Sequence, residues 1–147
     1  MFKHVLVPTD GSPLSDTAVT RSIAFAKEIG ARLTFFYSQP DFPMPIYGEG
    51  ALIDPMTPEQ FAQSAEQEAR RILDRAKAAA EAAGVSADTD SQVSETPYEA
   101  IIAAVGRHDC DLIFMASHGR RGIAGLLLGS ETQKVLTHCE TPVLVYR

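Results

Sequence analysis

Five short segments with strand character alternate along this chain with four segments whose apolar residues recur at helical spacing. The expected strands cover residues 4–8, 33–37, 85–94, 111–116 and 142–146. The expected helices begin near residues 13, 58, 97 and 130. Strict alternation of this kind gives a parallel sheet with helices on both faces, joined by right-handed crossovers. The sequence therefore predicts an α/β fold with an open, Rossmann-like, five-stranded parallel sheet, in one domain spanning residues 1–147.

Capping residues mark the ends of the first three helices. Ser12-Pro13, Thr57-Pro58 and Thr96-Pro97 each place an N-cap hydroxyl before a proline at the first helical position. Gly30 and Gly84 are expected C-caps. The helix that ends at Gly84 is therefore the longest of the four, and the polar strand that follows it is expected at a sheet edge.

The overall composition excludes several classes of protein. A net charge of −6 argues against general binding to nucleic acid or to an anionic membrane. No apolar run approaches the roughly 20 residues of a membrane helix. Cys110 and Cys139 suggest no disulfide scaffold, and with His108 and His138 they form no zinc-binding spacing. We expect a cytoplasmic protein without a structural metal.

Residues 39–56 differ in character from the rest of the chain. Four of the nine prolines fall in this segment, together with Gly48 and Gly50. We expect a long irregular loop, and loops of this length are usually functional or disordered.

A glycine-spaced loop, residues 117–129, joins the fourth expected strand to the last helix and carries the adjacent basic residues Arg120 and Arg121. The helix is expected to open with a capping box from Ser130 to Gln133. A strand, a glycine loop and a helix N-terminus together favour anion binding, because free backbone N–H groups and the positive end of the helix dipole meet there. Ligands of open parallel sheets bind at the carboxyl ends of the strands, so the turn at Asp10 is expected to share this crevice.

Four segments of the chain resemble the universal stress protein family, and the resemblance extends over essentially the whole length. They are residues 5–12, 111–119, 127–130 and 142–145. The ATP-binding branch of that family carries a glycine, two residues, a second glycine, nine residues, and a third glycine followed by serine or threonine. Gly119, Gly129 and Ser130 match the last three of these positions, whereas Ala116 stands in place of the first glycine.

The resemblance implies the adenine nucleotide alpha hydrolase-like form of the sheet, and a site for ATP, alone or with Mg²⁺. The implied contacts come from the ends of three strands and the start of the last helix. They are Pro8, Thr9, Asp10, Ser38, Ala116, Ser117, His118, Gly119, Arg120, Gly129, Ser130, Glu131 and Thr132. The resemblance also implies a homodimer, which agrees with the short apolar strand at residues 143–146, since an apolar edge tends to be paired or covered.

Two other functions remain open from the sequence. Ala116 and Ser38 depart from the family pattern, which is compatible with a dimeric interaction protein that does not use nucleotide. Slow ATP hydrolysis is a further alternative, although no general base and no P-loop lysine is identifiable. The leading hypothesis is an ATP-binding regulatory module of the stress response.

Overall fold

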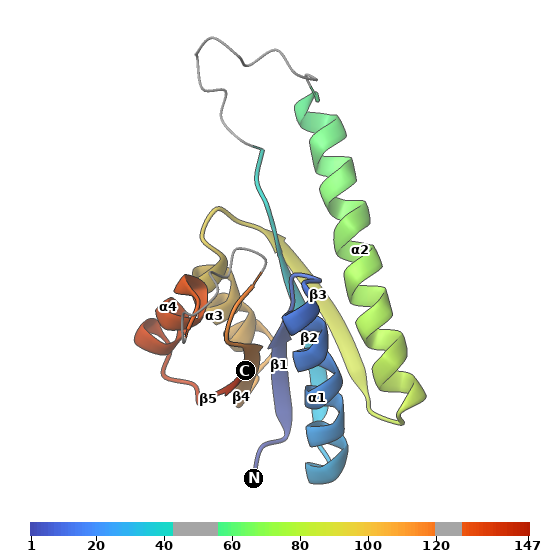
Figure 1. The fold of residues 1–147 in the computed structure, drawn as a ribbon, viewed down its shortest axis with the longest axis vertical. Coiled ribbons are helices and arrows are strands. Elements are labelled where there is room, and N and C mark those ends of the chain that lie inside the picture. The colour runs from blue at the N-terminus through green and yellow to red at the C-terminus, as the bar shows by residue number, and fades with distance from the viewer. Residues whose placement is uncertain (43–55, 120–127) are drawn as a thin grey trace.

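The computed structural model describes residues 1–42, 56–119 and 128–147, which form five strands and four helices (Figure 1). The strands are β1 (His4–Pro8), β2 (Arg32–Gln39), β3 (Ala87–Val93), β4 (Leu112–Ala116) and β5 (Val143–Tyr146). The helices are α1 (Pro13–Ile29), α2 (Pro58–Ala82), α3 (Pro97–Arg107) and α4 (Ser130–His138). All strand pairs are parallel and the order is β3-β2-β1-β4-β5, so the predicted five-stranded parallel sheet is confirmed.

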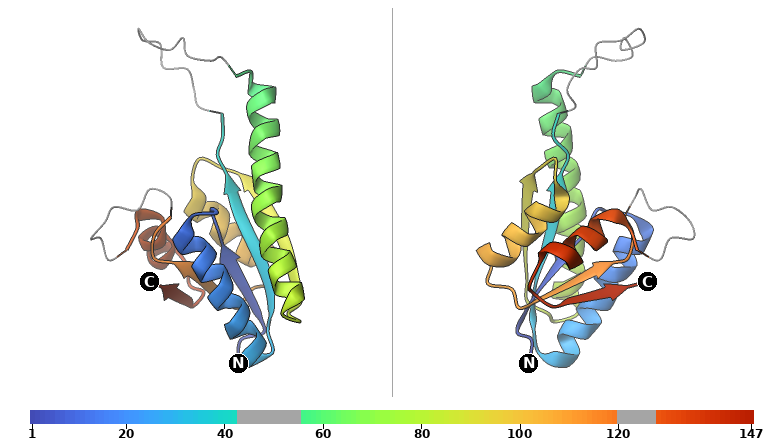
Figure 2. Two further views of the ribbon diagram at one scale, coloured as in Figure 1. Left: turned by 45° about the vertical axis from the view of Figure 1, so that its right-hand side comes forward. Right: turned by 90° about the vertical axis from the view of Figure 1, so that its left-hand side faces the viewer.

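The helices cover the sheet in two pairs, as the two views of Figure 2 show. Helices α1 and α2 pack on one face, against side chains such as Val5, Val7 and Phe35. Helices α3 and α4 pack on the other face, against side chains such as Leu6 and Phe36. Alternate residues of β1 thus serve opposite cores, as expected for a strand covered on both sides.

The two edge strands differ in chemistry. β3 is polar, as expected for 85–94, and its Asp90 accepts hydrogen bonds from Arg107 and from the His108 ring, the latter at 2.8 Å. Burial alone would raise the pKa of Asp90, but these two hydrogen bonds outweigh it and hold the pKa below its usual value. β5 lies at the opposite edge and is apolar and half-buried.

In the first three helices, the observed ends depart from the expected caps at two places. The last residue of α2 is Ala82 and its C-cap is Ala83, so Gly84 follows the cap in the left-handed conformation, with a φ of 79°. Thr96 is the N-cap of α3, but its hydroxyl bonds to the Glu99 carboxylate at 2.9 Å and caps no backbone N–H group. The side-chain caps expected of Ser12 and Thr57 are confirmed.

Strand β2 is longer than the expected 33–37 and takes in Gln39, the first residue of the expected 39–56 loop. Residues 43–55 of that loop lie outside the described residues. Figure 1 shows the first turns of α2 rising beyond the sheet, and its fully buried residues begin only at Ala69. The edge of the Phe61 ring in these first turns packs on Phe42, with ring centroids 5.5 Å apart. None of the helices in the described ranges is long and apolar enough to cross a membrane.

His4, at the start of β1, predicts a pH-dependent stability. Its ring is only 5% exposed and its Nε2 lies 2.7 Å from the Thr34 hydroxyl. Burial, reinforced by the charge of Arg32, lowers the pKa of His4 below the 6.5 of a free histidine. The unfolded chain therefore binds a proton that the native chain excludes, and stability is lost as the pH falls below 6.5.

We expect the free energy of unfolding of the wild type, relative to His4→Gln, to decrease from pH 7 to pH 5. Chemical denaturation at each pH measures this difference. A difference that stays constant over the interval would contradict the assignment of this pH dependence to His4.

Candidate functional site at the carboxyl ends of β1 and β4

The strand order reverses between β1 and β4, which are hydrogen-bonded neighbours with Leu6 aligned to Ile113. Chain segments leaving two adjacent strands at such a point separate to opposite faces of the sheet and leave a crevice between them. The turn at Asp10 and the segment after Ala116 both start at this edge. The structure therefore brings together the two loops that the sequence analysis placed in one crevice.

Contact between the two loops is made by Asp10 and Gly119. A Cβ atom built on Gly119 would lie 2.5 Å from Oδ2 of Asp10, a separation that real Cβ atoms do not show. Glycine at position 119 lets the backbone approach the carboxylate, and a larger residue there would have to displace the Asp10 side chain. Gly119, the second glycine position of the family motif, thus allows the segment after β4 to contact the turn after β1.

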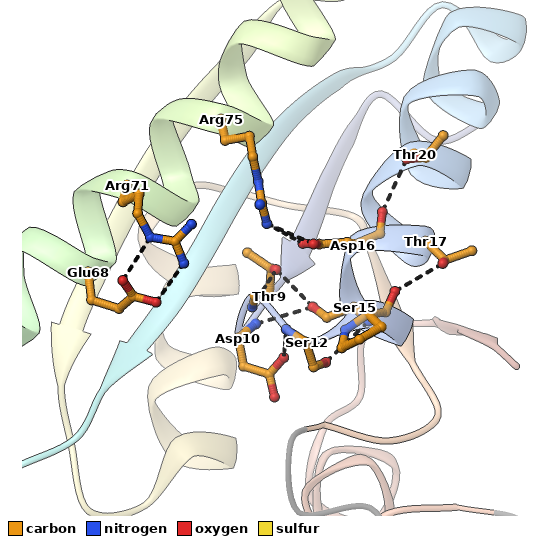
Figure 3. Close-up of polar contacts among 12 residues, drawn as sticks. Thr9, Asp10, Ser12, Ser15, Asp16, Thr17, Thr20, Glu68, Arg71 and Arg75 are labelled. Atoms are coloured by element: carbon orange, nitrogen blue, oxygen red, sulfur yellow. Dashed lines mark hydrogen bonds and ion pairs between the residues drawn. The ribbon is translucent and has the colours of Figure 1, made fainter.

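The Asp10 turn rests on the start of α1 (Figure 3). The Ser12 N–H donates to Oδ1 of Asp10 at 2.9 Å, and the Asp10 N–H donates to the Ser15 hydroxyl at 3.2 Å. The Ser15 hydroxyl in turn donates to Oγ1 of Thr9 at 2.8 Å. Gly11 takes a positive φ of 74°, which allows the tight turn between strand and helix.

Helix α4 does not start with the expected capping box. Gly129 is the N-cap, with extended backbone angles, and Ser130 is the first helical residue. The Gly129 carbonyl accepts from the Gln133 N–H at 3.1 Å, while its own N–H donates to the Ser117 carbonyl at 2.6 Å. This second bond fixes Gly129 in the cap position, so the Ser130 hydroxyl is not used as the helix cap.

Gly129 also packs closely against residues 117 and 118, which directly follow β4. A Cβ atom there would lie 3.1 Å from the Ser117 carbonyl oxygen and 3.3 Å from Cα of His118. Residues 117–119 and 128–130 are thus held together at the N-terminus of α4. Arg120 lies outside the described residues, so the expectation for it stays a prediction.

The side chains of Glu131 and Thr132 are used within the fold. Thr132 is buried, and its hydroxyl donates to the carbonyls of Ala116 at 3.1 Å and Ser117 at 3.2 Å. Glu131 accepts from the Tyr98 N–H at 2.9 Å, in the first turn of α3. The Glu131 carboxylate is therefore engaged with α3, whereas the backbone N–H groups of the α4 first turn and the Ser130 hydroxyl have no such partner among the described residues.

A comparison of the four helix N-termini singles out α4. Serine or threonine side chains cap α1 and α2, and Glu131 supplies a carboxylate to the first turn of α3. Within the described residues, α4 receives no side-chain acceptor. Its first N–H groups lack intrahelical partners, as at every helix start, and the positive end of its dipole lies beside residues 117–119.

Two buried polar atoms at this edge have no hydrogen-bond partner among the described residues. They are Oγ of Ser38, near the end of β2, and Nε2 of His118, whose Nδ1 lies 2.9 Å from the Ser117 hydroxyl. An unsatisfied buried polar atom destabilises a fold, and each such atom in a native structure calls for an explanation. Ser38 lies in β2 and His118 follows β4, and these two strands flank β1 on its opposite sides.

The remaining predicted residues lie at the same edge. Ala116 ends β4 and is 8% exposed, and Pro8 ends β1 and is half-buried. Thr9 is buried beneath the first turn of α1, and it also lines a groove of about 300 Å³ between α1 and α2. Ser15 was not among the predicted residues. A serine in the same helical stripe as the buried residues Ala18 and Ile23 was the pattern that could have indicated it.

Metal ligands do not gather at this edge in the described part of the chain. No three His, Cys, Asp or Glu side chains there are grouped so that they could hold one ion. Cys110 and Cys139 are free thiols, and burial raises the pKa of Cys110 to about 12, so that thiol is unreactive.

A family model decides what kind of protein carries this crevice: the model of the universal stress protein family matches residues 1–147. The chain belongs to the universal stress protein family. A universal stress protein of Thermus aquaticus is 34% identical to it, with each chain covered completely. The universal stress protein MJ0531 of Methanocaldococcus jannaschii is 30% identical, over all of this chain and 83% of the relative.

Solved structures agree with this assignment. The crystal structure of a universal stress protein in complex with cAMP has a TM-score of 0.72 and 26% identity. It covers 99% of this chain, and 97% of that chain is covered in turn. The fold predicted from the alternation of strands and helices is the fold of the family.

The contact between Gly119 and Asp10 predicts a position-specific effect of one methyl group. We expect Gly119→Ala to destabilise the protein by about 1–3 kcal/mol, because the added methyl group meets the Asp10 carboxylate. Most of this loss should disappear in an Asp10→Ala background, since the opposing oxygens are then gone. Urea denaturation of the wild type, the two single variants and the double variant measures the loss of stability and its dependence on Asp10.

Gly106→Ala is a matched control for this experiment. Gly106 lies in α3 and a Cβ atom there would meet nothing within 4 Å. That substitution should stabilise the protein by about 0.5–1 kcal/mol through the helix propensity of alanine. An equal loss for Gly119→Ala with and without Asp10 would show that the two residues do not interact.

Proposed function

We propose that this universal stress protein binds ATP in the crevice between the Asp10 turn and the start of α4, and acts as a nucleotide-dependent regulatory module. The observation that carries the proposal is the N-terminus of α4. The fold supplies acceptors to the first turns of α1, α2 and α3, and the described residues supply no side-chain acceptor to α4. A phosphate group is the natural partner of such a helix start.

The position of Asp10 supports a nucleotide over a simple anion. β1 and β4 are neighbours, so the Asp10 carboxylate and the phosphate end of the ligand would be separated by about one strand spacing, roughly 5 Å. A carboxylate at that distance from a phosphate accepts hydrogen bonds from hydroxyl groups, as a ribose provides. Ser38, one strand further, would face the base end.

Two further observations support the adenine nucleotide class. A family member 26% identical to this chain has been crystallised in complex with cAMP. The unpartnered atoms of Ser38 and His118 are the hydrogen-bonding groups that a polar ligand at this edge would satisfy. The residues present thus fit a nucleotide, with Gly119, Gly129 and Ser130 at its phosphates.

Calorimetric titration with ATP tests the proposal, with Asp10→Asn as the site variant. We expect the wild type to bind ATP and Asp10→Asn to bind about tenfold to a hundredfold more weakly, because a hydrogen bond to a charged group contributes about 1.5–3 kcal/mol. Asparagine keeps an oxygen for the Ser12 N–H, so the turn itself should survive.

Asp111→Asn is the matched control for this titration. Asp111 lies before β4, at the amino end of the sheet, and accepts from the Lys3 and His4 N–H groups at 2.8 and 3.0 Å. Its substitution should lower stability and leave the affinity for ATP unchanged. A wild type that gives no heat with ATP or cAMP would overturn the proposal in favour of an interaction protein that does not use nucleotide.

We infer further that the protein forms a homodimer through β5. The outer edge of β5 is not paired with another described strand, and its four residues are apolar and half-buried. Sedimentation at tens of micromolar, a range in which weak pairs persist, should show a dimer. Val145→Lys should give a monomer, because a lysine on an edge strand opposes pairing. Val93→Lys, on the polar edge strand β3, should stay dimeric, and a monomeric wild type would refute the inference.

A further inference from the structure

Three hydroxyl side chains lie buried beneath the Asp10 turn at the start of α1. Thr9, Ser12 and Ser15 are 6%, 5% and 3% exposed. Burying a hydroxyl is unfavourable unless it is hydrogen-bonded, so three such groups in two turns of chain indicate a built arrangement. Figure 3 shows them grouped around the backbone of Asp10.

Asp10 is held at two points by this group. Its N–H donates to the Ser15 hydroxyl at 3.2 Å, and its Oδ1 accepts from the Ser12 N–H at 2.9 Å. The Ser15 hydroxyl is itself oriented, because it donates its proton to Oγ1 of Thr9 at 2.8 Å. With main chain and carboxylate both held, Oδ2 lies close against Gly119.

The Ser15 side chain is not needed to cap α1. The cap bond of this helix runs from the Ser15 N–H to the Ser12 hydroxyl at 3.3 Å, and alanine at position 15 would keep it. Ser22 shows what a buried serine ordinarily does in this helix: its hydroxyl donates to the Val19 carbonyl, within α1, at 2.8 Å. Ser15 instead bonds outward, to the turn that carries Asp10.

The ion pair between the start of α1 and α2 stabilises this region less than the buried hydroxyl groups do. The next residue, Asp16, makes an ion pair with Arg75 of α2 at 2.8 and 2.7 Å. The two side chains are 42% and 51% exposed, and exposed pairs contribute little to stability. The hydroxyl of Ser15 is therefore a buried side-chain contact that helps to fix the turn.

We propose that Ser15 is a positioning residue of the nucleotide site, which holds the Asp10 carboxylate in the orientation that a ligand hydroxyl requires. This inference rests on the proposed function, in which Asp10 contacts the nucleotide. A carboxylate that is already oriented loses less freedom on binding, so its hydrogen bonds contribute more to affinity. Ser15 itself touches no ligand in this assignment.

The test compares two serine-to-alanine variants of one helix. Ser15→Ala removes the hydroxyl beneath Asp10, whereas Ser22→Ala removes a buried hydroxyl two turns further along α1. We expect ATP to bind Ser15→Ala about fivefold to tenfold more weakly, which corresponds to the loss of one neutral hydrogen bond. Ser22→Ala should bind like the wild type, and Ser15→Thr, which keeps the hydroxyl, should recover most of the affinity.

Amide hydrogen exchange of Asp10, followed by NMR without ligand, gives a second readout. Ser15→Ala should speed this exchange relative to the wild type, because the acceptor of the Asp10 N–H is lost, and Ser22→Ala should not. If Ser15→Ala fails to fold, Thr9→Val removes the acceptor that orients the Ser15 hydroxyl, and the exchange of the Asp10 N–H without ligand should again be faster than in the wild type.

The outcomes separate this inference from the proposed function. Equal ATP affinity for Ser15→Ala and Ser22→Ala, with a wild type that binds, would overturn the positioning role alone. A wild type that does not bind ATP would overturn the proposed function and, with it, the role of Ser15 toward a nucleotide. In that case, faster exchange in Ser15→Ala alone would still assign Ser15 to the Asp10 turn.

Discussion

The parallel pairing of β1 with β4 is the interaction on which the rest of the site depends. These strands are far apart in sequence, and their register sets Leu6 beside Ile113 at the centre of the sheet. β1 lies between β2 and β4, and its Val5, Leu6 and Val7 are completely buried. Because the core fixes this register, the turn at Asp10 and residues 117–119 are brought to one place, and the close contact of Gly119 with Asp10 follows.

Much of the fold could be predicted because its signals are local. The spacing of apolar residues, the proline at the start of three helices and the glycine after α1 each report on a few neighbouring residues. The polar character of residues 85–94 even predicted which strand lies at an edge. The convergence of two loops followed from topology alone, since parallel strands of one sheet end at one edge.

The details of the site could not be predicted because they depend on contacts between distant residues. Ser130 has the sequence of an N-cap, but the bond between the Gly129 N–H and the Ser117 carbonyl moves the cap back by one residue. Glu131 has the sequence of a residue near a phosphate, but its carboxylate bonds to Tyr98, 33 positions away. In the sequence, Ser15 is only one more small residue of a buried helical stripe. Its bond to the Asp10 N–H becomes apparent only in the structure.

The difference between the two edges of the sheet limits how many copies of the protein can associate through them. A protein whose sheet has two apolar, unpaired edges can bind a further copy at each edge, and the resulting row of copies can grow without limit. Here one edge carries Asp90 with its Arg107 and His108 partners, and the other carries the apolar residues of β5. Two copies that meet at β5 leave only polar strands outermost, so an association of this kind closes on itself and cannot extend into a fibre.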